Sequence, residues 1–438
     1  GIATFASSPQ APLMVVDGVP GRSINDIDPE DVESFSVLKD ATATAVYGVR
    51  GANGVILVKT KSGRAGKPSI NLEVNSAITS FTKLPKFLDG PTFMTLYNEG
   101  LTTRGQNALY TQEQIDRTAS GVDPDLSPNV DWYDVLFNNT GSNSRVNLNI
   151  SGGSTNATYY LSAGYFTETG LLKTDKVDAF NSKLKYDRFN YTTNLNINLT
   201  KNTTVEFGVT GFVSNLNQPA AGINNIFNLA TSTAPHVIPA VYSNGLFPQL
   251  SGTLASPYMA LTQSGVSNSV TNIVRSNVRL TQKLDNLLKG LSATGMFAFD
   301  VQSTNSTTRS RTLTTYFATG RDANGNLITQ ITTPGSVDLG FANGNYGNRQ
   351  FYGEAALNYV RNFDAHAVTG MVLFNQSDFR DYNAGSYTAA IPYRQRNLVG
   401  RVTYGYDNRY LAEGNFSYSG SDNFIPSKRF GFFPSFGV

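Results

Sequence analysis

The sequence predicts a mainly β fold: a large antiparallel transmembrane β-barrel, with about eleven of its strands present, and a small α/β domain in the barrel lumen. Three observations carry this prediction. From residue 67 onward, apolar and polar side chains alternate with period two in one stretch after another. Each stretch has roughly ten residues, the length that a tilted strand needs to cross a bilayer. Short turns alternate with long connections, as they do in outer-membrane barrels.

The composition narrows the possible functions. The chain has 438 residues and a net charge of +2, which argues against a dedicated nucleic-acid-binding protein. It contains no Cys, so disulfides, thiolate metal sites and a cysteine nucleophile are excluded. No apolar run approaches the roughly 18 residues of a transmembrane helix, and a membrane role therefore requires a barrel. Because the chain opens at Gly1 without Met or a signal peptide, we expect it to be a piece of a longer protein.

Residues 12–63 form a compact α/β unit, and within it the stretch 37–63 places short apolar runs next to Gly and Ala clusters. Asp28 is a preferred N-cap and Pro29 suits the first helical position, so we expect a helix to begin there. The other expected elements are strands over 12–18, 36–39 and 54–60 and a short helix over 40–48. So small a unit is marginally stable alone, and its Gly-rich turns suit close packing. We therefore expect residues 1–63 inside the lumen.

The expected barrel strands have one apolar and one polar face. Leu195 and Ile197 share one face of the stretch 191–199, and Asn194 and Asn196 share the other; we expect the apolar face to meet lipid. The candidate strands are 70–80, 145–151, 157–167, 191–199, 204–213, 273–281, 291–299, 351–360, 366–374, 398–406 and 410–419, and "RFGFFPSFGV" at 429–438 begins another. The long connections, which we expect at the cell exterior, are 81–143, 168–189, 214–270, 300–350 and 375–396.

Several segments resemble one known family. "PLMVVDGVP" and "IDPEDVESFSVLKDATATAVYGVRGANGVILVKTKSGRAGKP" resemble the plug signature of SusC/RagA-type TonB-dependent outer-membrane transporters. "NVDWYDVLF" and "NLNISGGSTNATYYLSAGYFTETG" resemble the first barrel segments of that family, and "RFGFFPSFGV" resembles its mid-barrel segment. The matches keep their order along nearly the whole chain.

This resemblance implies a 22-stranded barrel, of which residues 67–438 are the first half, and a plug whose C-terminal part is residues 1–66. It implies TonB-dependent active import of a nutrient, an oligosaccharide or a peptide, across the bacterial outer membrane. The implied partners are a SusD-like surface lipoprotein that acts as a lid, the TonB-ExbB-ExbD energising system and outer-membrane lipid. A non-transporting receptor or adhesin on the same barrel is the alternative. A barrel enzyme would need a nucleophile-base pair, and the sequence offers none.

For the other motifs, a structural role is favoured over a functional one. "GVRGANG" at 48–54 lacks the Lys-Ser/Thr ending of a phosphate loop, which favours tight packing turns. "DANGN" at 322–326 resembles the start of a calcium loop but lacks its acidic twelfth position, which favours an Asn-Gly turn. His236 and His366 lie far apart without a partner motif, and Trp132 favours packing over sugar stacking. We assign no catalytic, cofactor or metal residue, and the substrate-binding residues stay unassigned.

One ionic contact is expected between plug and barrel. Glu206, Glu354 and Glu413 fall on the polar faces of their strands, each a few residues from a short turn. Charged residues are scarce in this chain, so three at one level suggest a shared purpose. We expect Arg50 or a neighbouring plug cation to pair with at least one of them and lock the plug. The neighbouring plug cations are Lys39, Lys59 and Lys61.

Overall fold

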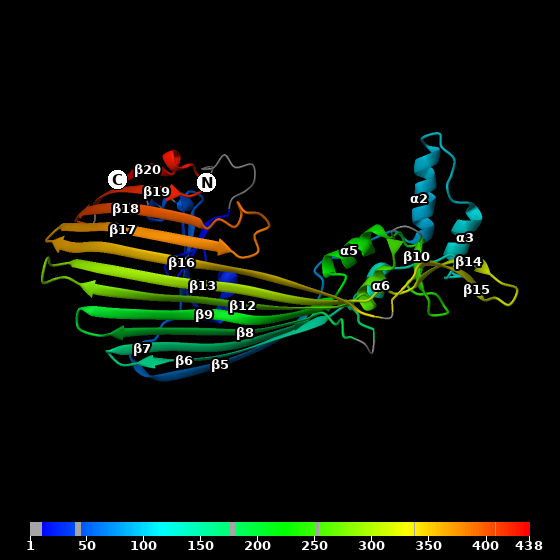
Figure 1. Cartoon of the computed structure of the whole chain (residues 1–438), viewed down its shortest axis with the longest axis horizontal. Coiled ribbons are helices and arrows are strands. Elements are labelled where there is room, and N and C mark those ends of the chain that lie inside the picture. The colour runs from blue at the N-terminus through cyan, green and yellow to red at the C-terminus, as the bar shows by residue number, and fades with distance from the viewer. Residues whose placement is uncertain (1–10, 40–44, 176–179, 251–253, 337, 408) are drawn as a thin grey trace.

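In the computed structural model, the described residues are 11–39, 45–175, 180–250, 254–336, 338–407 and 409–438. Their main feature is a 12-stranded antiparallel sheet in the order β20-β19-β18-β17-β16-β13-β12-β9-β8-β7-β6-β5. Residues 11–39 and 45–60 lie against one side of this sheet, and the long connections gather at one of its ends (Figure 1). The one-sided placement of these connections follows the prediction from the sequence.

All eleven expected strands are present, and the closing segment forms one more. Their bounds are β5 Gly66–Thr79, β6 Gly141–Gly153, β7 Ala157–Thr169, β8 Lys185–Asn198, β9 Thr203–Pro219, β12 Gly265–Lys283, β13 Leu291–Ser310, β16 Gly340–Phe363, β17 His366–Asp381, β18 Tyr393–Tyr406, β19 Tyr410–Ser421 and β20 Phe430–Gly437. At the short turns these bounds agree closely with the candidate ranges. At the opposite end most strands run further than expected.

The longest strands are much longer than the thickness of a bilayer. β16 has 24 residues, which is about 80 Å at ~3.4 Å per residue, against a hydrocarbon core of ~30 Å. The outer half of β13, "QSTNSTTRS" at 302–310, is polar on both faces and still pairs in register with β12 and β16. The period-two pattern ends where both faces of the strand become polar, and a strand range based on that pattern therefore stops too early.

The two faces of the sheet have the predicted polarity. Apolar side chains on the outer face are exposed, with Leu72 at 62% and Val74 at 65%. Polar side chains on the opposite face are covered, with Asn147 and Thr192 each at 1%. This distribution is the reverse of that in a water-soluble domain and suits a sheet with lipid outside and a polar interior.

The N-terminal unit is a four-stranded sheet in the order β2-β1-β4-β3, and we call it the plug. Its strands are β1 Leu13–Val16, β2 Val19–Pro20, β3 Val32–Leu38 and β4 Val55–Thr60. β1 and β4 are parallel and supply its buried core of Val15, Val16, Val55 and Val58.

The helix expected after Asp28 is wrong in length. Asp28 does cap, because its carboxylate accepts a hydrogen bond from the Glu30 amide, and Pro29 follows it. Only one 3₁₀ turn forms, however, and β3 begins at Val32 because its residues pair with β4. The pairing of whole strands outweighs a good local start signal. Of the second expected helix, 40–44 lie outside the described residues, and Ala45–Gly51 is a 3₁₀ segment kinked at Gly48.

Three long connections, 81–143, 214–270 and 300–350, form a packed unit that we call the outer module. It contains α2 Gly90–Thr102, α3 Gln112–Ser120, α4 Trp132–Leu136, α5 Ile223–Ser232 and α6 Pro257–Thr262, with short strands β10 Phe247–Leu250, β11 Leu254–Ala255, β14 Thr315–Arg321 and β15 Leu327–Thr333. Local signals start its helices: Asp89 caps α2, and Thr111 and Gln114 form a capping box on α3. Trp132, Leu136 and Ile226 lie at the centre of its core. From the sequence we expected these segments only as long connections.

Within the described residues, no helix has both the length and the apolar character that crossing a membrane requires.

Candidate functional site

The segment between β2 and β3, residues 21–31, attaches the plug to the large sheet. Two short turns shape it: Ser23 accepts a hydrogen bond from the Asn25 amide, and Asp28 accepts one from the Glu30 amide. Each turn uses a local side chain as its cap, so both form from sequence signals alone. The segment thereby presents one cation, Arg22, and several carboxylates to the sheet.

Arg22 makes the most buried ionic contact. Its Nε and Nη2 donate to the two carboxylate oxygens of Asp300 on β13, at 2.9 and 2.7 Å. Nη1 donates to Asn277 Oδ1 at 3.1 Å, and Nη2 also donates to the Ser276 carbonyl at 2.9 Å, both on β12. The Arg22 and Asp300 side chains are each 2% exposed. A two-pronged contact of this geometry neutralises the buried charge of Asp300 and also fixes the position of the plug on the sheet.

Plug carboxylates make further contacts with the sheet. Arg275 on β12 donates from Nε and Nη2 to Asp26 Oδ2, at 3.0 and 2.8 Å. The Tyr160 hydroxyl on β7 donates to Asp31 Oδ1 at 2.8 Å. Burial raises the pKa of the Asp31 carboxyl above its usual value, although the hydrogen bonds that it accepts act in the opposite direction.

The remaining plug contacts are tight but small. Val19 packs with Met296, Ala298 and Tyr352 in a buried apolar cluster. Gly48 has φ +59°, and a Cβ atom there would lie 2.6 Å from Ser419 Oγ, so a larger residue would strain this approach. This arrangement supports the packing interpretation of "GVRGANG". Polar contacts and close backbone approach therefore hold the plug on the sheet.

The expected contact of Arg50 with a glutamate is replaced by other pairs. Glu206 lies 3.6 Å from Arg279 Nε, Glu413 pairs with Arg401 at 2.8 Å, and Glu354 accepts from the Tyr352 hydroxyl at 2.7 Å. Among the residues that the structure describes, no ion pair joins a plug cation to any of the three glutamates.

Arg50 does lie at the interface. It lines a small space with Tyr352, Asn375 and Asn397 of the sheet, and burial lowers the pKa of its guanidinium. The sheet residues that line this space carry an aromatic ring, amides or a hydroxyl, and none is charged. Within the plug itself, Lys59 pairs with Glu33 at 2.9 Å.

Sequence reasoning missed the observed contacts for an identifiable reason. Asp28 was expected only as a helix cap, whereas Asp26, Asp28 and Asp31 supply the plug side of three contacts with the sheet. The period-two pattern could have indicated these partners. Arg275 lies on the same face of its strand as Asn277, which contacts the plug, and Asp300 lies on the same face as the buried Ala298. Asp300 lies one residue past the candidate range 291–299, and the early end of that range hid it.

A cavity of about 570 Å³ lies between the plug segment and strands β6, β7 and β8. Its plug wall is mostly apolar, and its sheet wall is basic and aromatic. The plug residues are Ile24, Asn25, Ile27, Asp28, Pro29 and Val32, and the sheet residues are Arg145, Phe166, Tyr186, Arg188 and Asn190. On each strand, the sheet residues of the cavity lie on the same face as the buried polar residues. The period-two pattern therefore already indicated that they face the interior.

The register of the sheet places three of these residues in a row. Arg145 on β6 is the cross-strand partner of Phe166 on β7, and Phe166 is the partner of Arg188 on β8. The Arg145 guanidinium lies 5.4 Å from the Phe166 ring centre. That of Arg188 lies 3.8 Å from the ring centre of Phe212 on β9. Stacking on aromatic faces orders guanidinium groups and leaves their edges for ligands.

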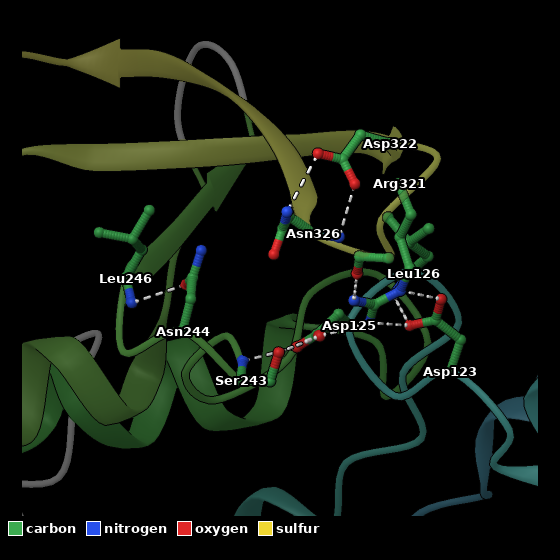
Figure 2. A network of polar contacts seen from close by, with 10 residues as sticks. Asp123, Asp125, Leu126, Ser243, Asn244, Leu246, Arg321, Asp322 and Asn326 are labelled. Atoms are coloured by element: carbon green, nitrogen blue, oxygen red, sulfur yellow. Dashed lines mark hydrogen bonds and ion pairs between the residues drawn. The ribbon is translucent and has the colours of Figure 1, made fainter.

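A separate polar network joins three connections of the outer module (Figure 2). Arg321 binds both carboxylate oxygens of Asp123, each at 2.8 Å, and Asp125 Oδ2 at 2.7 Å. Asp125 also accepts from the amide and hydroxyl of Ser243, at 2.8 and 2.6 Å. The hydrogen bonds from Arg321 hold the pKa of Asp123 below its usual value. Such links make the outer module one unit.

The other motifs have structural roles. Trp132 is 4% exposed in the core of the outer module, as the packing interpretation predicted. Asp322 Oδ1 accepts from the amides of Asn324 and Asn326, which makes "DANGN" an Asn-Gly turn. His236 contacts the Tyr110 hydroxyl at 2.9 Å. His366 belongs to β17, one of the strands of the large sheet.

Comparison with protein families and curated proteins gives consistent results. Residues 1–55 match the family described as TonB-dependent Receptor Plug Domain. TonB-dependent receptor P3 of Formosa agariphila is 28% identical over 97% of this chain and 40% of its own length. TonB-dependent receptor SusC of Bacteroides thetaiotaomicron is 31% identical over 40% of this chain and 17% of its own length. The chain therefore spans less than half the length of these relatives.

Among solved structures, the chain is similar to one described as the RagAB peptide transporter. The TM-score is 0.73 with 18% sequence identity, over 97% of this chain and 50% of the other. A second, the RagAB peptide importer in its closed-closed state, gives a TM-score of 0.70 over the same shares. At this identity the likeness shows a common fold: a strand-rich sheet around a plug.

Proposed function

Starting from a chain of the SusC/RagA type of TonB-dependent receptors, we propose that the protein imports a nutrient across the bacterial outer membrane. The nutrient is an oligosaccharide or a peptide, and import is active and depends on TonB. The chain supplies part of the plug, residues 1–66, and the first half of the barrel, residues 67–438. The protein acts as the barrel subunit of a SusCD-like complex.

The observation that carries this proposal is the polar attachment of the plug. Arg22, Asp26 and Asp31 face charged or hydroxyl partners on the sheet, and apolar contact is confined to small clusters. A polar interface of this kind can open without exposing a large apolar surface to water, because water replaces the lost hydrogen bonds. A plug built for permanent closure would be expected to bury a continuous hydrophobic surface.

The outer module supports the proposed lipoprotein lid. Its three connections are tied together by Arg321, which gives a fixed surface at the end of the sheet remote from the short turns. Several of its apolar side chains are exposed: Phe87, Leu88, Leu96, Tyr97 and Leu109. A partner such as a SusD-like lipoprotein would cover such residues. TonB-ExbB-ExbD would act on the plug from the opposite side.

The experiment follows uptake in the native host. Ligand that co-purifies with the complete complex is identified by mass spectrometry, labelled and returned to cells. Import should require both this protein and a working TonB, while binding at the cell surface should survive loss of TonB.

Surface binding without any TonB-dependent accumulation would instead favour the alternative, a non-transporting receptor or adhesin. Uptake that is unchanged after deletion of this gene would refute the proposal. Deletion of a lipoprotein that co-purifies with the complex should lower uptake at low ligand concentration, because the lid is proposed to aid capture.

A further inference from the structure

We propose that the cavity between the plug and strands β6 to β8 is a subsite for a carboxylate on the imported ligand. The inference rests on the proposed function, since it names a chemical feature of the nutrient. Arg145 and Arg188 would receive the carboxylate, and the apolar plug wall would receive the adjoining part of the ligand.

Two guanidinium groups lie on one face of the sheet at this cavity. Arg145, Phe166 and Arg188 are consecutive cross-strand partners, so the two arginines stand two strands apart. At ~4.8 Å between strands, their Cα atoms are about 10 Å apart. Two like charges at this spacing repel each other, and an anion between them relieves that repulsion.

Arg188 is held in place by stacking but is short of hydrogen-bond partners. Its guanidinium is stacked on Phe212, and its Nε donates to Asn190 Oδ1 at 2.9 Å. Arg188 Nη2 and Asn190 Nδ2 are buried and have no hydrogen-bond partner in the protein. In the part of the chain that the structure describes, no carboxylate forms an ion pair with Arg188. Arg188 and Asn190 therefore each retain one unpaired N–H donor in the cavity wall. Unpaired buried donors favour a ligand that carries hydrogen-bond acceptors.

The negative charge that the protein itself supplies to the two arginines is weak. The carboxylate among the residues lining the cavity is that of Asp28, and Arg145 Nη1 lies 3.9 Å from its Oδ1, beyond hydrogen-bond length. The same Oδ1 already accepts from the Glu30 amide at 3.0 Å. With two guanidinium groups and one carboxylate, the lining keeps a net positive charge. A ligand carboxylate would compete with Asp28 for Arg145 at little cost.

The remaining walls select the rest of the ligand. Ile24, Ile27 and Val32 of the plug face an aromatic pair, Phe166 and Tyr186, whose ring centres are 6.2 Å apart. A planar carboxylate suits the fork of a guanidinium, and an apolar or ring-shaped neighbour suits these walls. A peptide carboxyl group and a uronic-acid sugar share this chemistry.

The test uses two pairs of small probes and the complete receptor, purified with any lipoprotein that accompanies it. N-acetylphenylalanine and its amide represent the peptide source, and phenyl glucuronide and phenyl glucoside represent the sugar source. Calorimetric titration should show at least one acid binding about tenfold or more tightly than its neutral counterpart. The arm with the larger ratio identifies the source. Equal affinities within both pairs, or no acid binding up to roughly 10 mM, would overturn the proposal.

Three variants sharpen this test. Arg188→Met should remove the preference for the acid. Asn190→Asp should do the same, although its carboxylate can still accept from Arg188 Nε, because it places a negative charge at the subsite. Arg361→Met is the matched control, since Arg361 also lies over an aromatic ring, Phe363 at 4.5 Å, near a short turn. If Arg188→Met and Asn190→Asp both still bind the acid more tightly than its neutral counterpart, the proposal is wrong.

This test is independent of energised transport. The titration contains no TonB, so loss of acid preference with intact TonB-dependent uptake would overturn only the subsite. Acid preference in a protein whose cells show no TonB-dependent uptake would support the subsite and overturn the proposed import.

Discussion

The Arg22–Asp300 pair predicts how firmly the plug is held. In Arg22→Met, the Asp300 carboxylate stays 2% exposed and loses its two hydrogen bonds from the guanidinium. Leaving one charge of a buried pair unpaired costs about 3–5 kcal/mol. We expect a loss of this size in the free energy of plug opening. Asp300→Leu should cost a similar amount, because Arg22 then keeps only Asn277 and Ser276 as partners.

The double variant separates a pair from two independent sites. Arg22→Met with Asp300→Leu leaves no buried charge, so its cost should lie well below the sum of the single costs, with a coupling of about 2 kcal/mol or more. Arg401→Met is the control. Arg401 also binds its glutamate through Nε and Nη2, but it is 38% exposed, and exposed pairs contribute about 1 kcal/mol or less.

Hydrogen exchange of the plug amides, followed by mass spectrometry in the complete receptor, measures these opening free energies. The amides of β1 and β4 are the reporters because they lie in the plug core. Single variants that exchange within about 1 kcal/mol of the unaltered protein would refute the reasoning. So would a double variant whose cost equals the sum of the two.

Three further predictions test the facing of the sheet, the outer module and the topology. Leu195→Arg should cost about 2–4 kcal/mol of folding free energy in liposomes and Asn196→Arg much less; equal costs would mean that the facing is wrong. Burial lowers the pKa of His236, so the unfolded module binds a proton first, and stability should fall as pH drops below about 6.5. Exchange of α2 amides between pH 7.5 and 5 measures this effect, and a pH dependence that is unchanged in His236→Gln would contradict it. Asn324→Cys should react with an impermeant maleimide on whole cells once the lid is removed, whereas labelling only after permeabilisation would invert the topology.

Much of the fold was readable from local pattern. The period-two alternation gave the strands, their order along the chain and the face that each side chain takes, as Leu195 and Asn196 illustrate. Capping signals also predicted single turns correctly, since Asp28 is the N-cap of the turn Pro29–Asp31. They did not fix how far each element runs: Asp28 starts one 3₁₀ turn because the residues from Val32 onward pair with β4.

The candidate site was less accessible from the sequence. The residues of the cavity wall had a visible parity, but their partners come from strands whose register no short segment specifies. Arg50 illustrates the difficulty: it is a plug cation at the sheet, as expected, yet its neighbours there are Tyr352 and Asn375. A list of charged residues on polar faces gives candidates for pairing without deciding among them.

The alternation of outward-facing and interior-facing residues, the plug and the resemblance to one family can all be read along the chain, because each depends on residues that are close in sequence. The contact of Arg22 with Asp300, 278 residues away, and the shared core of Trp132 and Ile226 became visible only in the folded chain. Side-chain period fixes which face a residue occupies, whereas the complete strand register and the packing of the long connections fix which distant residue it meets.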